Sequence, residues 1–141
     1  MKSKINNVKL FVAVLKGITK ITDKAHFDVK KNELRIRSID PFDFCYMDIK
    51  LHSSIFDNYK IQKTKTSFGI EIGALKKLLN SIKNKEVSLE INKNELKLGF
   101  LTNWKKTYSL KWLDDDEFDL PEPVNLSYDT KFTISSADFL N

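Results

Sequence analysis

The sequence predicts an α+β domain in which two helices pack on antiparallel sheets. Stretches of alternating polar and apolar residues, typical of half-buried strands, recur along the chain, and turn sequences such as KKN and NKN join several of them as hairpins. Two other segments carry apolar residues at helical spacing. Hairpins interrupted by two amphipathic helices are typical of the α+β class.

The first third of the chain is expected to hold a short strand, a helix and three longer strands. Residues 2–6 predict the short strand, and Asn7 is a suitable cap for a helix over 8–22. The helix has one apolar stripe, made of Phe11, Val14, Leu15, Ile18 and Ile21. The three strands that follow are expected at 25–29, 33–39 and 44–51.

The next segments predict a second helix among further strands. A short helical turn is expected at 53–59, with Phe56 and Tyr59 as its anchors. The strands are expected at 59–63, 66–72, 86–92, 95–101 and 106–112, and the second helix at 72–83. The apolar face of that helix comprises Ile72, Leu75, Leu78, Leu79 and Ile82.

After residue 112 the composition changes. Residues 113–123 carry six acids, no base and two prolines, which indicates a linker. A strand at 126–134 and a serine-capped helix start at 135–141 follow, which weakly repeats the strand–cap–helix pattern of the N-terminus. We therefore expect one domain over 1–112, a connector over 113–123, and the first strand and helix start of a second domain over 124–141.

The charge is unevenly distributed. Residues 1–112 hold 23 Lys and Arg against 11 Asp and Glu, while the whole chain has a net charge of +5. A basic body suggests a polyanionic partner. A Lys-rich genome would give the same composition, so composition alone leaves both explanations open.

The sequence offers little support for catalysis. Its two histidines, His26 and His52, lie in unrelated contexts, and it has neither a glycine-rich phosphate loop nor metal-ligand spacing. The acids at 114–117 could hold a cation but fit a solvated linker better. We expect no enzyme activity and no cofactor. A single cysteine, no signal sequence and no membrane-length apolar run suggest a soluble intracellular protein.

Both predicted helices carry lysines away from their apolar stripes, and neither basic face carries an acid. Lysines normally occupy the solvated face of any amphipathic helix, and this remains the simpler explanation. However, faces without Glu lack the usual i to i+4 pairs and suit contact with a phosphate backbone. No aromatic or Arg/Asn/Gln cluster accompanies them, so binding would be blind to sequence and salt-dependent.

The stretch SIDPFDFCYMDIKL, residues 38–51, breaks the expected pattern. Alternation places Cys45, Met47, Ile49 and Leu51 toward the core, and Phe44 and Tyr46 on the outer face beside Asp48 and Lys50. Ile39 falls on the side of the preceding strand that carries Arg35 and Arg37. Apolar residues on an outward face suggest an interaction site.

These segments together resemble PCNA, the sliding clamp of archaea and eukaryotes. The resemblance covers nearly the whole chain and rests on the order and spacing of AHFDVKKNELRIRSIDPFDFCYMDIKL, FDNYKI, GIEIGALKKLLNSIKNKEVSLEI and the acidic segment ending FDLPEP. It implies the DNA-clamp fold, in which subunits form a ring with helices lining the hole and sheets outside. Duplex DNA passes through the hole.

The resemblance also implies two sets of site residues. The residues facing DNA would be Lys9, Lys16, Lys20, Lys76, Lys77 and Lys83. The pocket for the short motif of polymerases, nucleases and ligases would comprise Ile39, Phe44, Tyr46, Phe118, Leu120 and Pro121. An alternative is that Phe118 and Leu120 permanently cover the first three.

The expected function is a DNA sliding clamp subunit or its N-terminal half, a non-enzymatic scaffold that binds duplex DNA, replication and repair proteins, and other clamp subunits. Clamp subunits are about twice this length and commonly acidic, so a truncated, naturally short or split subunit all fit. The alternatives are a monomeric clamp-like accessory or inhibitor protein and a simple nucleic-acid-binding module. The protein would be cytoplasmic and nucleoid-associated in an archaeon, and nuclear in a eukaryote.

Overall fold

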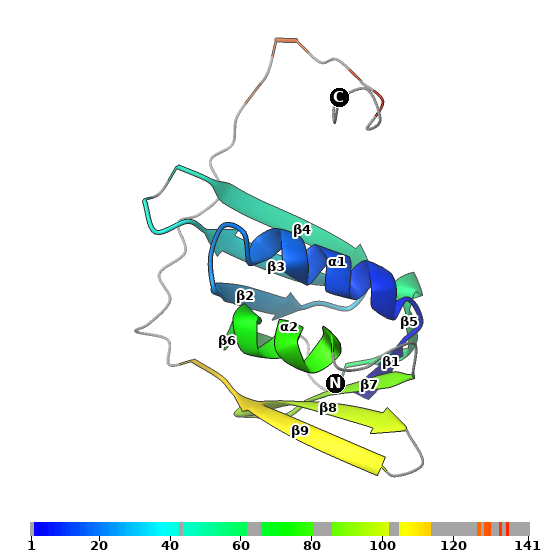
Figure 1. Cartoon of the computed structure of the whole chain (residues 1–141). Helices are drawn as coiled ribbons and strands as arrows, with labels where there is room; N and C mark the ends of the chain where they lie inside the picture. The colour runs from blue at the N-terminus through cyan, green and yellow to red at the C-terminus, as the bar shows by residue number, and fades with distance from the viewer. Residues whose placement is uncertain are drawn as a thin grey trace.

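A computed structural model describes residues 2–42, 44–61, 66–80, 86–101 and 105–113, together with residues 127, 129, 130, 133 and 135. Within these ranges the chain forms two antiparallel sheets and two α-helices, which confirms the expected α+β class (Figure 1). No helix in the described ranges is long and apolar enough to cross a membrane. Most of the predicted connector and second domain lies outside the described residues, so their boundaries stay a prediction.

The first sheet has five strands in the order β5-β1-β7-β8-β9. Its strands are β1 (Lys2–Ile5), β5 (Phe56–Lys60), β7 (Val87–Ile91), β8 (Glu95–Leu101) and β9 (Lys105–Lys111). The N-terminal strand β1 lies inside this sheet, between β5 and β7. Among the described strands, β9 pairs with β8 along one side only.

The second sheet has four strands in the order β4-β3-β2-β6. They are β2 (Lys24–Val29), β3 (Glu33–Ile39), β4 (Tyr46–His52) and β6 (Thr66–Glu71). A bridge joins this sheet to Leu113, two residues after the end of β9: the backbone N–H of Leu113 donates to the Gly69 carbonyl at 3.0 Å. Trp112 stacks on Phe68 with ring centroids 4.6 Å apart, which anchors the end of β9 to the core.

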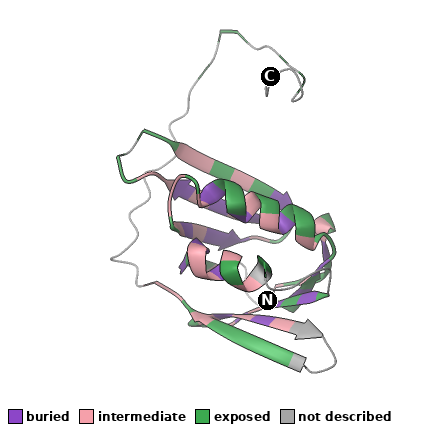
Figure 2. Ribbon diagram, in the orientation of Figure 1, coloured by how far each residue is buried: buried purple, intermediate pink, exposed green. Residues whose placement is uncertain are grey.

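Helices α1 (Val8–Ile18) and α2 (Ile72–Asn80) lie side by side over the sheets. Asn7 caps α1 by accepting the N–H of Leu10 at 3.0 Å, as expected. The apolar stripes point inward: Phe11, Leu15 and Ile18 of α1 and Ile72 and Leu75 of α2 are fully buried. The opposite sides of both helices are exposed (Figure 2).

The first helix is shorter than predicted. It ends at Ile18, and Lys20 and Ile21 belong to the turn that follows. The backbone N–H groups of Lys20 and Ile21 bond to carbonyls three residues earlier, which tightens the chain so that β2 can begin at Lys24. The second helix is described to Asn80, and the rest of its predicted range lies outside the described residues.

The prediction for 53–63 is wrong in part. Only Ser53–Ile55 form a helical turn, of the 3₁₀ type, and β5 starts at Phe56 rather than residue 59. Because β5 begins at Phe56, it can pair with the edge of β1 that does not pair with β7. Phe56 and Tyr59 do anchor the segment: Phe56 packs edge-on against Phe11, and the Tyr59 hydroxyl donates to the carbonyls of Lys30 and Glu33.

Candidate functional site

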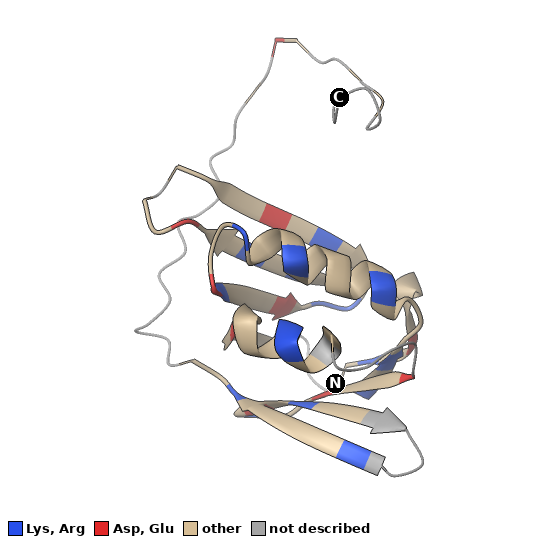
Figure 3. Ribbon diagram, viewed as in Figure 1, with Lys and Arg blue, Asp and Glu red and all other residues tan. Residues whose placement is uncertain are grey.

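A basic face covers the exposed side of both helices. Lys9 and Lys16 of α1 and Lys77 of α2 are exposed, and we refer to these three residues as the helix lysine face. Figure 3 shows the blue bands on both helices, without a red one. The printed sequences of α1 and α2 contain no Asp or Glu, so no acid within either helix neutralises these lysines.

The other three lysines predicted to face DNA have different positions. Lys20 is exposed but lies in the turn after α1 rather than on the helix. Lys76 is half-buried, and its Nζ donates to Oγ1 of Thr19 at 3.1 Å, so it ties α2 to the end of α1. Lys83 lies outside the described residues.

The outer face of the four-stranded sheet carries a buried ion pair. Nη2 of Arg37 donates to Oδ2 of Asp28 at 2.8 Å, and Ser67 Oγ donates to Oδ1 at 2.5 Å. His26 Nδ1 lies 3.6 Å from that same Oδ1. Burial raises the pKa of the Asp28 carboxyl, but the Ser67 hydrogen bond and the charges of Arg37 and His26 outweigh burial and hold the pKa below its ordinary value.

A second ion pair fills the neighbouring part of this face. Nε and Nη2 of Arg35 donate to Oδ1 and Oδ2 of Asp48, both at 2.7 Å, in a bidentate arrangement. This contact lowers the pKa of Asp48 and raises that of Arg35. Both arginines beside Ile39 on β3 are therefore paired with carboxylates. They stiffen the surface rather than offering free charge to an anion.

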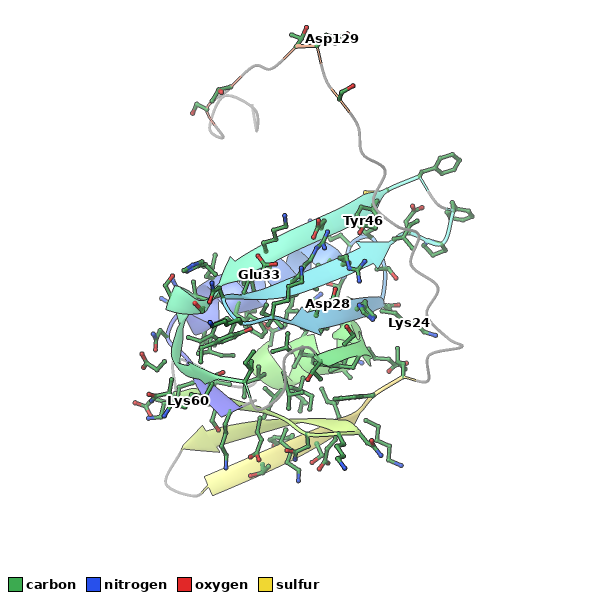
Figure 4. All side chains as sticks on the ribbon, turned by 180° about the vertical axis from the view of Figure 1, so that it is seen from behind. Lys24, Asp28, Glu33, Tyr46, Lys60 and Asp129 are labelled. Carbon is green, nitrogen blue, oxygen red and sulfur yellow. The ribbon has the colours of Figure 1, made fainter. Side chains whose placement is uncertain are left out.

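The end of the β3–β4 hairpin gathers the predicted partner-binding residues that the structure describes. Ile39 and Tyr46 are cross-strand partners, both half-buried, and Phe44 precedes β4 with 92% of its surface exposed. Figure 4 shows this outer face, with Tyr46 at one end of the sheet and Glu33 toward the other. Phe118, Leu120 and Pro121 lie outside the described residues.

The prediction that Cys45 points into the core is wrong. Cys45 is exposed, because β4 begins at Tyr46 and the alternating pattern does not extend through the preceding loop. From Tyr46 onward the prediction holds: Leu51 is buried and Met47 and Ile49 pack against the core, whereas Asp48 and Lys50 are exposed.

Sequence reasoning missed two residues of this loop. Phe42 is 77% exposed, and Asp40 accepts backbone hydrogen bonds from Phe42 and Cys45. The Asp-Pro pair at 40–41 was the available signal, because Asp commonly bonds to the backbone two residues later.

Among the surface recesses formed by described residues are two on the five-stranded side of the molecule. One is lined by Asn92, Lys93, Asn94, Glu95, Lys111, Trp112 and Leu113, and the other by Lys4, Ile5, Asn6, Asn7, Val8, Lys9, Asp57 and Glu86. Neither includes Ile39, Phe44 or Tyr46. The described ranges contain no group of three His, Cys, Asp or Glu side chains suited to a metal ion, and the acids at 114–117 lie outside those ranges.

The sequence was compared with the models of known protein families. Residues 1–117 match the family described as "Proliferating cell nuclear antigen, N-terminal domain". The chain belongs to this PCNA family. Its similarity to curated relatives extends over the whole chain: it is 28% identical over 145 residues to "DNA polymerase sliding clamp 2" of Saccharolobus solfataricus, covering 100% of this chain and 59% of that protein.

A second curated relative shows a similar level of identity. The sliding clamp of Thermococcus onnurineus is 27% identical over 120 residues, covering 84% of this chain and 48% of that protein. The chain thus spans about half the length of the curated relatives it matches.

Solved PCNA structures share the fold. A PCNA2–PCNA3 complex from Sulfolobus tokodaii superposes with a TM-score of 0.78 at 22% identity, covering 91% of this chain and 52% of that one. A. fulgidus PCNA, solved with the C-terminal region of FEN-1 bound, superposes with a TM-score of 0.78 at 18% sequence identity. The superposition covers 89% of this chain and 51% of that one. At these identities the likeness establishes the fold alone.

Proposed function

We propose that this chain is a DNA sliding clamp subunit or its N-terminal half, a non-enzymatic scaffold that holds replication and repair proteins on duplex DNA. The observation that carries the proposal is the division of the molecule into two faces. The helix lysine face lies on one side, and the aromatic end of the β3–β4 hairpin lies on the outer side of the sheet. The relatives named as DNA polymerase sliding clamps support it.

DNA contact is assigned to the helix lysine face, with Lys20 beside it. Lysines are compact charges on flexible stems, suited to phosphates rather than to base edges. Lys76 is assigned a weaker part because its ammonium already bonds to Thr19. Lys83 is retained on family resemblance alone. Such a surface can bind duplex DNA of any base sequence and allows the protein to slide along it.

Partner binding is assigned to Ile39, Phe44 and Tyr46, joined by Phe118, Leu120 and Pro121 of the connector at 113–123. A short peptide that buries Phe44 would remove a large apolar surface from water. The structure of A. fulgidus PCNA with the C-terminal region of FEN-1 bound provides a precedent for a partner's C-terminal region on this fold.

Subunit contact is assigned to β9. One side of this strand pairs with no other described strand, and unpaired edges accept strands from other chains. The PCNA2–PCNA3 complex provides a precedent for contact between such subunits. A ring of this kind leaves the helices facing the enclosed DNA.

Replacing Lys9, Lys16 and Lys77 together by alanine should weaken binding to duplex DNA. Each lysine that contacts a phosphate releases about one counterion, so the slope of log affinity against log salt should fall by roughly three. The affinity itself should drop about tenfold or more at low salt. Fluorescence anisotropy with a random-sequence duplex, measured across a salt series, gives both quantities.

The matched control replaces Lys31, Lys50 and Lys60 by alanine. All three are exposed, and none belongs to a helix or to β9, so the net charge changes equally while the helix lysine face stays intact. If the control lowers affinity and slope as much as the helix variant, the assignment of DNA contact to the helices is wrong.

A further inference from the structure

One side chain closes the loop that joins β3 to β4. The carboxylate of Asp40 accepts the backbone N–H of Cys45 through Oδ1 at 2.5 Å and that of Phe42 through Oδ2 at 3.2 Å. The backbone N–H of Asp40 also donates to the Cys45 carbonyl at 3.0 Å. Asp40 therefore bonds across the loop from its start to its end.

The hydrogen bonds stabilise the ionised form of Asp40. The N–H of Cys45 contributes most, with those of Phe42 and Phe44, and together they hold the pKa of this carboxyl below its ordinary value. The ionised group accepts a hydrogen bond on each oxygen, and the bond from the Cys45 N–H is clearly the shorter of the two.

The aromatic residues of the loop provide little packing of their own. Phe42 is 77% and Phe44 92% exposed, so burial against the domain cannot fix the loop's shape. Such a short loop keeps a single conformation only if local bonds offset its conformational entropy. In the described part of this loop, the side-chain bonds that do so come from Asp40.

We propose that Asp40 is a positioning residue for partner binding, which holds Phe44 at the rim of the Ile39–Tyr46 pair before a peptide arrives. This role rests on the proposed partner-binding function. Asp40 acts through the backbone of Phe42 and Cys45 and does not itself touch the peptide. Because apparent affinity scales with the fraction of molecules already in the binding-competent conformation, a disordered loop lowers affinity without removing any contact.

Three substitutions separate this role from a direct charge effect. Asp40→Asn keeps an acceptor of the same length for the Cys45 N–H but loses the charge. Asp40→Glu keeps the charge but moves the carboxylate one methylene away. Asp40→Ala loses both. If Asp40 positions the loop, the Asn variant should retain most of the peptide affinity, and the Glu and Ala variants should each lose about tenfold. If the charge of Asp40 instead attracts a basic peptide, the Glu variant should retain the affinity and the Asn variant should lose it.

The experiment titrates each variant with a synthetic peptide of the C-terminal region of an archaeal FEN-1, by calorimetry. Amide hydrogen exchange of Cys45 is measured in the free proteins, where protection should fall in the Glu and Ala variants but persist in the Asn variant. Asp57→Ala, an exposed carboxylate on the other sheet, is the control. Unfolding midpoints should stay within a few degrees of wild type, because the loop packs little against the core.

The outcomes are distinguishable. A wild type that binds, with all Asp40 variants within about threefold of it, overturns the positioning role and leaves the proposed function standing. If the Glu variant binds the peptide like wild type and the Asn variant binds it weakly, the positioning role is also overturned. The charge of residue 40 would then attract the peptide directly. A wild type that does not bind the peptide overturns both the partner-binding function and the role of Asp40 in it.

Discussion

Replacing Phe44 and Tyr46 together by alanine should lower affinity for the FEN-1 C-terminal peptide at least about a hundredfold while the domain stays folded. Aromatic anchors at the centre of an interface commonly contribute about 2 kcal/mol or more each, and two of them exceed a factor of one hundred. Calorimetry measures the affinity, and circular dichroism with a urea titration establishes that the fold is intact.

Phe44→Ala alone provides a test free of any folding effect, because the side chain is 92% exposed. It should lose roughly tenfold or more. Leu10→Ala, which shortens an exposed apolar side chain on α1, is the control and should bind normally. Unchanged affinity in a well-folded double variant would exclude this end of the hairpin as the peptide site.

The second large effect is expected at Asp28. Replacing it by alanine should destabilise the domain by about 3 kcal/mol, because Arg37 and Ser67 lose their shared partner on a largely buried surface. Asp28→Asn should cost less, since the amide oxygen still accepts a hydrogen bond. Urea unfolding measures the difference, with Asp57→Ala expected to change stability by less than about 1 kcal/mol.

The pH dependence of that difference follows from the lowered pKa of Asp28. A carboxyl whose folded pKa lies below its unfolded value stabilises the fold fully above the unfolded value, near 3.8, and progressively less as the pH falls through the folded pKa. The stability gap between wild type and Asp28→Asn should thus narrow as the pH falls below about 3.8 and the carboxylate takes up its proton. A gap that does not narrow in this acidic range contradicts the ion pair.

Several features of the fold could be predicted from the sequence because they depend on local periodicity. The outward positions of Ile39 and Tyr46 follow from two-residue alternation, which the register of β3 against β4 confirms. The capped start of α1 follows from Asn7 and the apolar stripe. The alternation and the helix cap are each encoded within a single secondary-structure element.

Other features depend on how elements meet. Alternation gives the face of Asp28 but not the diagonal contact with Arg37, which sits one strand away and off its direct register partner. Two-residue alternation does not place Cys45, because this residue lies in a loop that is held by the Asp40 carboxylate and not by strand pairing. Lys76 was predicted to face DNA, but the position of Thr19 at the end of α1 became evident only in three dimensions.

The most direct test of the two-faced account uses the single cysteine of the sequence. A photo-crosslinker attached to exposed Cys45 reports on the outer hairpin, and the same reagent on Lys16→Cys, in a Cys45→Ser background, reports on the helix lysine face. Both proteins are irradiated with duplex DNA and, separately, with the FEN-1 peptide. We predict that DNA is captured from position 16 and the peptide from position 45. Equal capture of DNA from both positions, or capture mainly from position 45, would contradict the account.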